Sequence, residues 1–402
     1  MIKKPVPVFM YHSIGVPNKN WKWNYLTTPY EDFEKELIYL KKHGFSTIHL
    51  ADLDHYINSN QKIPDKSVVL TFDDGYVDNY IFAYPLLKKY GFKGTIFVNP
   101  DFVDPRGLVR ERIDENNEVI NQNTTGFLSW EEMKIMESDG TIDIQSHALT
   151  HTWYPISDKI IDYRHLGDLY WWMTWNDFPD KKPFLQLDKD ELIKLGAPVY
   201  ENEKSLMSTR YFPNEELSNY LTSYVTKNGG LEFFKNSNWK EILDTEKNKF
   251  IETTNSEEGY FETEDERLER IKFELAQSKK IIEENLDKEI HYLCWPGGSG
   301  TTEGHSISRE LGYRMTTAAR DIPASKRKMI KNDGLIYPDR IGRTSPVLHN
   351  YVQSGLQNTI YSRGFGMGLK IKAFCSHSYK RKFFAASVLI LGRLNFLFKS
   401  KL

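Results

Sequence analysis

Cysteine is scarce in this chain of 402 residues, which contains only Cys294 and Cys375. Two cysteines cannot build the disulfide framework of a small secreted protein, so a reducing compartment is the simpler expectation. The N-terminus also lacks the apolar stretch and the small-residue cleavage site of a signal peptide, because its first apolar residues form a short strand pattern. These two absences predict a cytoplasmic protein.

Acidic residues are missing from the C-terminal part of the chain. The formal net charge is −2, yet residues 340–402 contain no Asp or Glu and eleven Lys or Arg. These are Arg340, Arg343, Arg363, Lys370, Lys372, Lys380, Arg381, Lys382, Arg393, Lys399 and Lys401. Such a split predicts an anionic partner for the tail, either nucleic acid or a membrane surface. We expect no nucleic acid, because nothing else in the chain resembles a fold that binds it.

The last part of the tail, residues 379–398, couples Lys380, Arg381 and Lys382 to a mostly apolar segment. The segment is too short, and with Arg393 too polar, for a membrane span. It suits a helix lying in the interface of an anionic bilayer. The alternative is a C-terminal helix docked on the domain with its basic residues solvated. We expect peripheral contact with the inner face of the cytoplasmic membrane through residues 379–402.

Strand and helix patterns alternate through the first 151 residues. Strands are expected at residues 6–11, 46–50, 68–72, 94–98 and 141–146. A capping box at Thr28 to Glu31, with Pro29 at the first helical position, predicts a helix start. The alternation predicts an α/β barrel or sheet with its ligand at the carboxyl ends of the strands.

The alternation stops after His151, and residues 152–261 read as one large insertion. It is rich in aromatics, among them Trp171, Trp172 and Trp175, which could line a sugar-binding groove or pack a lid. A second capping box, Thr263 to Glu266, then opens a long amphipathic helix. The expected parts are a barrel of residues 1–151 and 262–345, the insertion, and a basic tail of residues 346–402.

The stretch "TFDDGY", residues 71–76, places Asp73 and Asp74 directly after an apolar strand. Neighbouring anions raise each other's pKa and repel unless a cation or a proton lies between them. One interpretation is a surface turn, since Asp-Asp-Gly is a common loop composition. The other is a site in which one Asp binds a metal and the other acts as a base.

The stretch "SHALTH", residues 146–151, also comes after a strand and holds His147 and His151 at a spacing of four. That spacing places both imidazoles on one face of a helical turn, from which both can reach one metal. Two unrelated surface histidines are the alternative. One Asp with two His makes a ligand set for Zn²⁺ or a similar divalent ion.

These motifs, with "PVFMYHSI" at residues 7–14 and "YLCWPGG" at residues 292–298, resemble the polysaccharide deacetylases of the NodB-homology type, carbohydrate esterase family 4. The motif order is most similar to poly-N-acetylglucosamine deacetylase-like members. The resemblance covers residues 5–151 and about 262–345, and implies a distorted (β/α) barrel with a large insertion. It implies a hydrolase that removes acetyl groups from an N-acetylated sugar in surface-glycan biosynthesis.

The resemblance also implies roles for single residues. Asp73 would be the general base, while Asp74, His147 and His151 would bind one divalent ion, most simply Zn²⁺, with Co²⁺, Ni²⁺ or Mn²⁺ as substitutes. A backbone N–H in the loop Trp295, Pro296 and Gly297 would stabilise the oxyanion. Tyr76 and this loop would contact the substrate.

The proton donor to the leaving amine has two candidates. "FMYHSI" resembles the branch that uses an early histidine, which makes His12 the expected acid, with His349 of Val347-Leu348-His349 as the alternative. The loop reads WPGG where the family commonly has Pro-Tyr, and the Arg often found just upstream is absent, so the acyl pocket is expected to differ. A carbohydrate-binding relative without catalysis and an amidase on another N-acyl substrate remain alternative functions.

Overall fold

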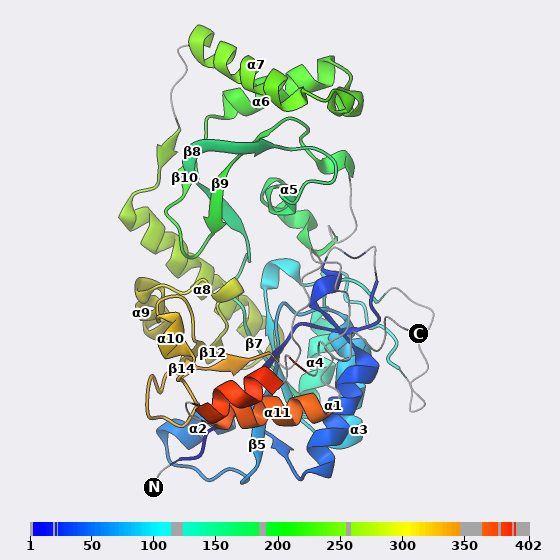
Figure 1. Ribbon diagram of the computed structural model, residues 1–402, viewed down its shortest axis with the longest axis vertical. Coiled ribbons are helices and arrows are strands. Elements are labelled where there is room, and N and C mark those ends of the chain that lie inside the picture. The colour runs from blue at the N-terminus through cyan, green and yellow to red at the C-terminus, as the bar shows by residue number, and fades with distance from the viewer. Residues whose placement is uncertain are drawn as a thin grey trace. The chain divides into compact units, whose positions relative to one another are not determined.

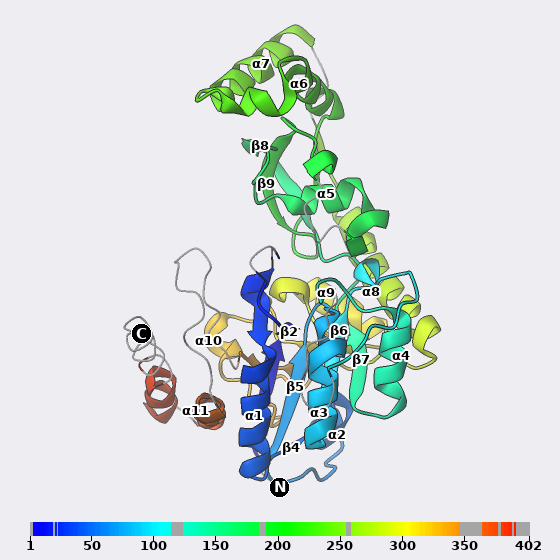
Figure 2. The ribbon, with the colours of Figure 1, turned by 90° about the vertical axis from the view of Figure 1, so that its right-hand side faces the viewer.

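The computed structural model describes residues 3–18, 21, 23–113, 124–184, 190–254, 259–345, 364–376, 379–387 and 390. The chain divides into two compact units (Figures 1 and 2). The first is Met1–Thr150 with Glu274–Leu402, and the second is His151–Phe273. The second unit thus contains the expected insertion and also the first turns of the helix after it.

The first unit is built on a sheet of nine described strands whose pairings are all parallel. Along the sheet the order is β14-β13-β12-β7-β6-β5-β1-β15, and β4 adds to β5. The strands are β1 (Val8–Tyr11), β4 (Ser46–Thr47), β5 (Ser67–Phe72), β6 (Gly94–Val98), β7 (Ile142–Ser146), β12 (Tyr292–Leu293), β13 (Met315–Thr317), β14 (Arg340–Ile341) and β15 (Arg343–Thr344).

The sheet closes on itself at one glycine. β14 pairs with β13 and β15 pairs with β1, yet only Gly342 separates β14 from β15 along the chain. A Cβ at Gly342 would lie 2.6 Å from the carbonyl oxygen of Ile330, so a larger residue would not fit without a shift. One continuous segment therefore joins the two ends of the sheet, which confirms the expected distorted barrel.

Helices cover the outside of this barrel (Figure 2). They are α1 (Tyr30–Lys42), α2 (Leu50–Asn58), α3 (Tyr84–Tyr90), α4 (Trp130–Ser138), α8 (Glu264–Leu286), α9 (Thr302–Glu310), α10 (Ala324–Arg327) and α11 (Gly364–Cys375). Inside, Val8, Val69 and Phe97 pack with residues of β12, β13 and β14 in one cluster. Leu50, Leu53 and Ile57 of α2 belong to the same cluster. All of β5 is buried, as its unbroken apolar run predicts.

The first unit also contains shorter elements. They are β2 (Ser13–Gly15), β3 (Thr27–Pro29), the 3-10 turns Asn24–Leu26, Pro100–Phe102 and Pro296–Gly298, and the π-helical turn Asn79–Ala83.

The second unit pairs β8 (Trp153–Tyr163) with β9 (Pro198–Lys204) in an antiparallel ribbon. Its other elements are α5 (Trp171–Asp177), α6 (Glu215–Lys227), α7 (Trp239–Thr254), β10 (Tyr211–Phe212), β11 (Tyr260–Phe261) and the 3-10 turns Pro179–Phe184, Asp190–Leu192 and Gly230–Lys235. Leu221, Val225 and Leu243 are fully buried between α6 and α7. This unit therefore has its own core. Trp172 and Trp175 are also buried, as expected of packing residues.

The two predicted capping boxes have opposite outcomes. At Thr263 the hydroxyl accepts from the N–H of Glu266 (3.3 Å) and the Glu266 carboxylate accepts from the N–H of Thr263 (2.7 Å), which confirms the box. At Thr28 the prediction is wrong. α1 begins at Tyr30 with Pro29 as its N-cap and without a side-chain cap, because Thr28 belongs to the strand β3.

A buried carboxyl on α1 should make stability depend on pH. The Tyr11 hydroxyl donates to Glu36 (2.5 Å), and burial raises the pKa of Glu36 to about 8. The pKa of this carboxyl is 4.5 in the unfolded chain. Between pH 4.5 and about pH 8, the folded protein therefore keeps a proton that the unfolded chain has lost. Stability from this group is complete below pH 4.5 and falls as pH rises, by up to about 1.4 kcal/mol per pH unit.

We predict that Glu36→Gln is more stable than the parent above about pH 8 and gains nothing near pH 4. Urea unfolding across this range measures the difference, with Glu31→Gln on the exposed face of the same helix as the control. Equal pH dependence in parent and Glu36→Gln would contradict the prediction.

Candidate active site

The two adjacent carboxylates at the end of β5 occupy different surroundings. The N–H of Asp73 continues the ladder to the carbonyl of Tyr11 (3.0 Å), and its side chain is buried. Asp74 then turns the chain with φ 73°, and Gly75 comes next with φ 71°. A left-handed conformation is costly for a non-glycine residue and is often kept at functional sites. The turn separates the two side chains.

His147 comes directly after β7 and is held by two hydrogen bonds. Its N–H donates to the carbonyl of Val98 (2.8 Å), and its Nδ1 lies 2.8 Å from the carbonyl oxygen of Cys294. A carbonyl only accepts, so Nδ1 carries a proton, which leaves Nε2 as the nitrogen that could bind a metal. Nε2 lies 3.1 Å from Oδ1 of Asp74. The imidazole is thus oriented as a metal ligand beside a carboxylate.

The expected helical turn between His147 and His151 is wrong, because these residues form a loop. Ala148 and His151 have φ 58° and 43°, which no α-helix contains. The buried amide of Asn99 donates to the carbonyls of His147 and Ala148. Hydrogen bonds to neighbours replace the helical ladder.

Thr150 anchors the other end of this loop. Its N–H and its hydroxyl donate to the two carboxylate oxygens of Glu274 on α8 (3.1 and 2.5 Å). His151 is the next residue, so its position depends on this bidentate contact.

Ligand atoms of Asp74, His147 and His151 lie within 4.8 Å of one another. Burial disfavours a charge on His147, but Cys294 and Asp74 beside it raise its pKa well above its usual range. The surroundings therefore favour a cation, and two imidazoles with one carboxylate are a ligand set that divalent zinc accepts. The three residues fit the metal that the sequence predicts.

A second group, Asp73, His147 and Cys294, is equally close-set but already has a cation. The Arg343 guanidinium donates to Oδ1 of Asp73 (2.6 Å) and to Sγ of Cys294 (3.1 Å). Adding a divalent ion there would bring two positive charges together. This group therefore does not fit a metal.

Arg343 keeps Asp73 ionised. Burial alone would raise the pKa of Asp73, but Arg343, and then His147 and His12, lower it below its usual range. The same pairing raises the pKa of Arg343 although the guanidinium is buried. Asp73 is therefore an anion poised to accept a proton.

Sequence patterns do not predict this role, because Arg343 counts among the cations near the C-terminus and the Arg often found upstream of the WPGG loop is absent. Strand β15 supplies the cation instead, and the usable signal was an Arg within a short strand pattern. Cys294, also missed, is a free and buried thiol whose Sγ lies 3.6 Å from Oδ2 of Asp73.

His12 lies beside the same carboxylate. It comes directly after β1, and its Nε2 is 4.0 Å from Oδ2 of Asp73. Its carbonyl accepts from the side-chain amide of Asn79 (3.0 Å). The structure thus brings His12 to the site, whereas the alternative acid, His349, lies outside the described residues.

The WPGG loop presents backbone more than side chains. The N–H of Trp295 donates to the Thr317 hydroxyl (3.0 Å), and Pro296 begins a 3-10 turn in which Gly297 has φ 53°. The Trp295 indole is buried, and a Cβ at Gly300 would lie 2.9 Å from it. The ring packs the loop, so a contact between loop and substrate would have to come from elsewhere in 295–297.

Tyr76 is buried between aromatic rings. It stacks on Phe127 (5.3 Å between centroids) and meets Trp21 edge to face (6.0 Å). Burial, and then the charge of Asp74, raise the pKa of Tyr76. Its hydroxyl is therefore a neutral donor near the metal ligands.

The buried Asp73–Arg343 pair yields a stability prediction. Removing one partner of a buried ion pair leaves an uncompensated charge, so Arg343→Met should destabilise the metal-free protein by about 3–5 kcal/mol. Adding Asp73→Asn should recover part of that loss. Chemical denaturation measures both, with Lys159→Met in the exposed Lys159–Glu201 pair as a control of little effect. A double variant no more stable than Arg343→Met would show that the two charges are not coupled.

Two solved structures are similar to this chain at low identity. The deacetylase domain of BpsB from Bordetella bronchiseptica is 15% identical, with a TM-score of 0.49 over 85% of this chain and 95% of that one. A de-N-acetylase from Aggregatibacter actinomycetemcomitans is 17% identical, with a TM-score of 0.48 over 78% of this chain and 87% of that one. Scores below 0.5 do not establish a shared fold, so the fold assignment rests on the closed parallel sheet.

Curated relatives match shorter segments. A protein of Bacillus subtilis (strain 168) that carries the name polysaccharide deacetylase YxkH is 34% identical over 146 residues, 36% of this chain and 43% of that protein. A poly-beta-1,6-N-acetyl-D-glucosamine N-deacetylase of Staphylococcus aureus (strain MRSA252) is 30% identical over 125 residues, 31% of this chain and 37% of that protein. The chain thus spans less than half the length of these relatives.

The family model described as polysaccharide deacetylase matches residues 60–168. The matched segment contains Asp73, Asp74, His147 and His151, the residues that the structure brings together. With the order of the motifs, this match makes the segment similar to the polysaccharide deacetylases of the NodB-homology type.

Proposed function

We propose that this protein is a metal-dependent N-deacetylase that removes acetyl groups from an N-acetylated sugar in surface polysaccharide or glycolipid biosynthesis. It would be a hydrolase of carbon–nitrogen bonds other than peptide bonds. The observation that carries the proposal is the pairing of two distinct carboxylates: Asp74 beside His147 and His151, and Asp73 beside Arg343. Relatives named as polysaccharide and poly-N-acetylglucosamine deacetylases support the substrate class.

The donor set of one carboxylate and two imidazoles favours Zn²⁺, with Co²⁺, Ni²⁺ or Mn²⁺ as substitutes. When bound, such an ion supplies Lewis-acid chemistry, by lowering the pKa of water and polarising an acyl oxygen. Asp74, His147 and His151 would hold it, and the hydrogen bond from Nδ1 of His147 to the Cys294 carbonyl would fix the ring.

Asp73 is the proposed general base. Its carboxylate stays anionic beside Arg343 and takes a proton from the attacking water as the carbon–oxygen bond forms. A backbone N–H of the 295–297 loop would donate to the oxyanion. Arg343 orients Asp73 and does not itself reach the substrate in this assignment.

His12 is the proposed acid. As the carbon–nitrogen bond breaks, a proton from the imidazole passes to the amine, and acetate and a free amino sugar result. Its Nε2 lies 4.0 Å from the Asp73 carboxylate, so base and acid flank the same space. His349 is the alternative donor.

Aromatic rings next to His151 support a saccharide substrate. Within the second unit, the Trp153 ring lies 5.7 Å from that of His151, and Trp171 meets Trp153 edge to face at 5.3 Å. Both indoles are partly exposed. Apolar faces of sugar rings pack against such surfaces, so we assign Trp153 a role in holding the sugar beside His151.

We predict that the protein releases acetate from N-acetylhexosamine oligosaccharides and that a chelator stops the reaction. Because Asp73 is the base, Asp73→Asn should lower kcat by about 10²- to 10⁴-fold. Acetate assays measure this, with Asp65→Asn as a matched exchange at an exposed carboxylate. Full activity in Asp73→Asn would overturn the assigned base.

The same assay separates the alternative functions. A protein that binds the oligosaccharide without releasing acetate, even with metal supplied, would be a carbohydrate-binding relative. Release of acyl groups from N-acyl amino acids or small amides, but not from the sugar, would make it another amidase.

The metal assignment is tested without activity. We predict that the protein retains one divalent ion per chain after dialysis, and that replacing Asp74, His147 and His151 together by Ala abolishes retention. Elemental analysis gives the stoichiometry, with His43→Ala on the surface as the control. Unchanged stoichiometry in the triple variant would place the metal elsewhere.

A further inference from the structure

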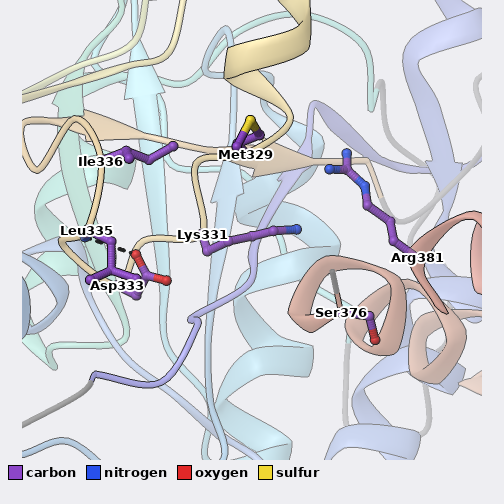
Figure 3. A pocket seen from close by; sticks show the side chains of 7 residues that line it. All are labelled: Met329, Lys331, Asp333, Leu335, Ile336, Ser376 and Arg381. Atoms are coloured by element: carbon purple, nitrogen blue, oxygen red, sulfur yellow. Dashed lines mark hydrogen bonds between the residues drawn. The ribbon is translucent and has the colours of Figure 1, made fainter. Parts of the chain in front are cut away.

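A cavity lies in the first unit, outside the proposed catalytic residues. Its volume is about 340 Å³, and it is lined by Met329, Lys331, Asp333, Leu335, Ser376 and Arg381 among others (Figure 3). The first four belong to the segment after α10, whereas Ser376 directly follows α11 and Arg381 lies in the C-terminal part of the chain. Arg381 lies in a helix at residues 379–387 and donates to the carbonyl of Lys328, which ties the two segments together.

Two cationic side chains face this cavity. Figure 3 shows Lys331 and Arg381 pointing toward one another from the two segments. The Lys331 ammonium lies 4.8 Å from the centroid of the Phe374 ring and donates to the Phe374 carbonyl. An ammonium has three donors, and that carbonyl uses one of them. The Asp333 carboxylate accepts from the N–H of Leu335 (3.1 Å) in its own turn.

Burial, and then the charge of Arg381, lower the pKa of Lys331 to about 8. An anion bound between the two cations would remove this repulsion.

The surface around the cavity combines positive charge with exposed apolar groups. Lys326 and Lys328 belong to α10 and the residues after it, Lys380 and Lys382 belong to the helix at residues 379–387, and all four are exposed. Residues 322–332 and 340–402 contain no acidic residue. Met329, Leu335, Tyr379 and Phe383 have exposed fractions of 60%, 71%, 84% and 67%. Lysines beside exposed aromatic and aliphatic side chains are typical of surfaces that lie on an anionic bilayer.

We propose that this face docks on an anionic phospholipid membrane, with a lipid phosphate held between Lys331 and Arg381. Among the described residues, no helix is long and apolar enough to cross a membrane. The proposed contact is peripheral and electrostatic, and exposed apolar side chains of the same two segments enter the interface.

The docking face leaves the catalytic residues uncovered. The carbonyl of Lys331 accepts from the N–H of Val6 (3.0 Å), just before β1 begins, whereas His12 lies just beyond the end of β1. The cavity and the metal ligands thus lie toward opposite ends of the same strand. Docking needs none of the catalytic residues, so it is independent of the proposed deacetylation.

The test is sedimentation of the full chain with vesicles of phosphatidylcholine containing phosphatidylglycerol, against phosphatidylcholine alone. We expect binding only to the anionic vesicles, weakened by salt. Replacing Lys326, Lys380 and Lys382 by Glu should lower the partition coefficient by about 100-fold or more, because three favourable charges are lost. The matched control replaces the exposed residues Lys42, Lys62 and Lys134 by Glu and should bind as the parent does.

Two further variants test the cavity and the exposed aromatic side chains of the helix at residues 379–387. Arg381→Met should weaken the preference for the anionic vesicles, and Tyr379→Ser with Phe383→Ser should weaken binding to them at fixed charge. Circular dichroism of each variant verifies that it is folded. Failure of the parent to bind anionic vesicles, or equal loss in the two triple variants, would overturn the proposal. Competition by a DNA duplex at lower concentration than the lipid would reassign the face to nucleic acid.

Discussion

The buried ion pair between Asp73 and Arg343 is the interaction on which the rest of the site depends. A carboxylate so deeply buried stays ionised only beside a cation, and Arg343 provides it at 2.6 Å. Arg343 can do so because β15 pairs with β1, in the register Val8 with Arg343, at the point where the sheet closes. The charge state of Asp73 therefore depends on closure of the barrel. A change that opened the seam at Gly342 would also withdraw the cation from Asp73.

The neighbouring carboxylates have different partners. Asp73 faces Arg343, while the left-handed turn at Asp74 directs its side chain to His147 and His151. Asp73 and Asp74 are thus adjacent in sequence, but their carboxylates contact different groups and do not share a proton. The strain at Asp74, and that at Ala148 and His151, is held by buried hydrogen bonds such as those from Asn99. The surroundings of the site therefore stabilise its local geometry.

Local patterns in the sequence are sufficient to predict much of the barrel and most of the site. Strand ends carrying polar motifs bring Asp73, Asp74, His147 and His12 together, because parallel strands end at one edge. Contacts that form only when the sheet closes into a barrel are not predictable in this way. The sequence alone therefore gives no sign that Arg343 contacts Asp73. The spacing of His147 and His151 suggests a helix, but positive φ values and the Thr150–Glu274 contact form a loop instead. Thr28 meets the pattern of a capping box, yet pairing in β3 outweighs it, whereas Thr263 has no such competitor.

The cations of the C-terminal part form two groups, those with partners inside the protein and those exposed on its surface. Arg340 and Arg343 lie within the barrel, paired with Asp321 (2.7 Å) and Asp73, and Lys370 of α11 lies near the buried Glu36. These three side chains face partners within the fold and are not available to an external partner. Lys380 and Lys382 are exposed, and with Lys326 and Lys328 they form a surface rich in one sign of charge. A cation that is paired inside the protein contributes little to the attraction between the protein and a membrane. The attraction must therefore come from the exposed lysines and from the cavity between Lys331 and Arg381. Not all eleven cations of residues 340–402 can therefore attract an anionic membrane. Lys326 and Lys328, which precede this segment in sequence, add to the exposed positive charge.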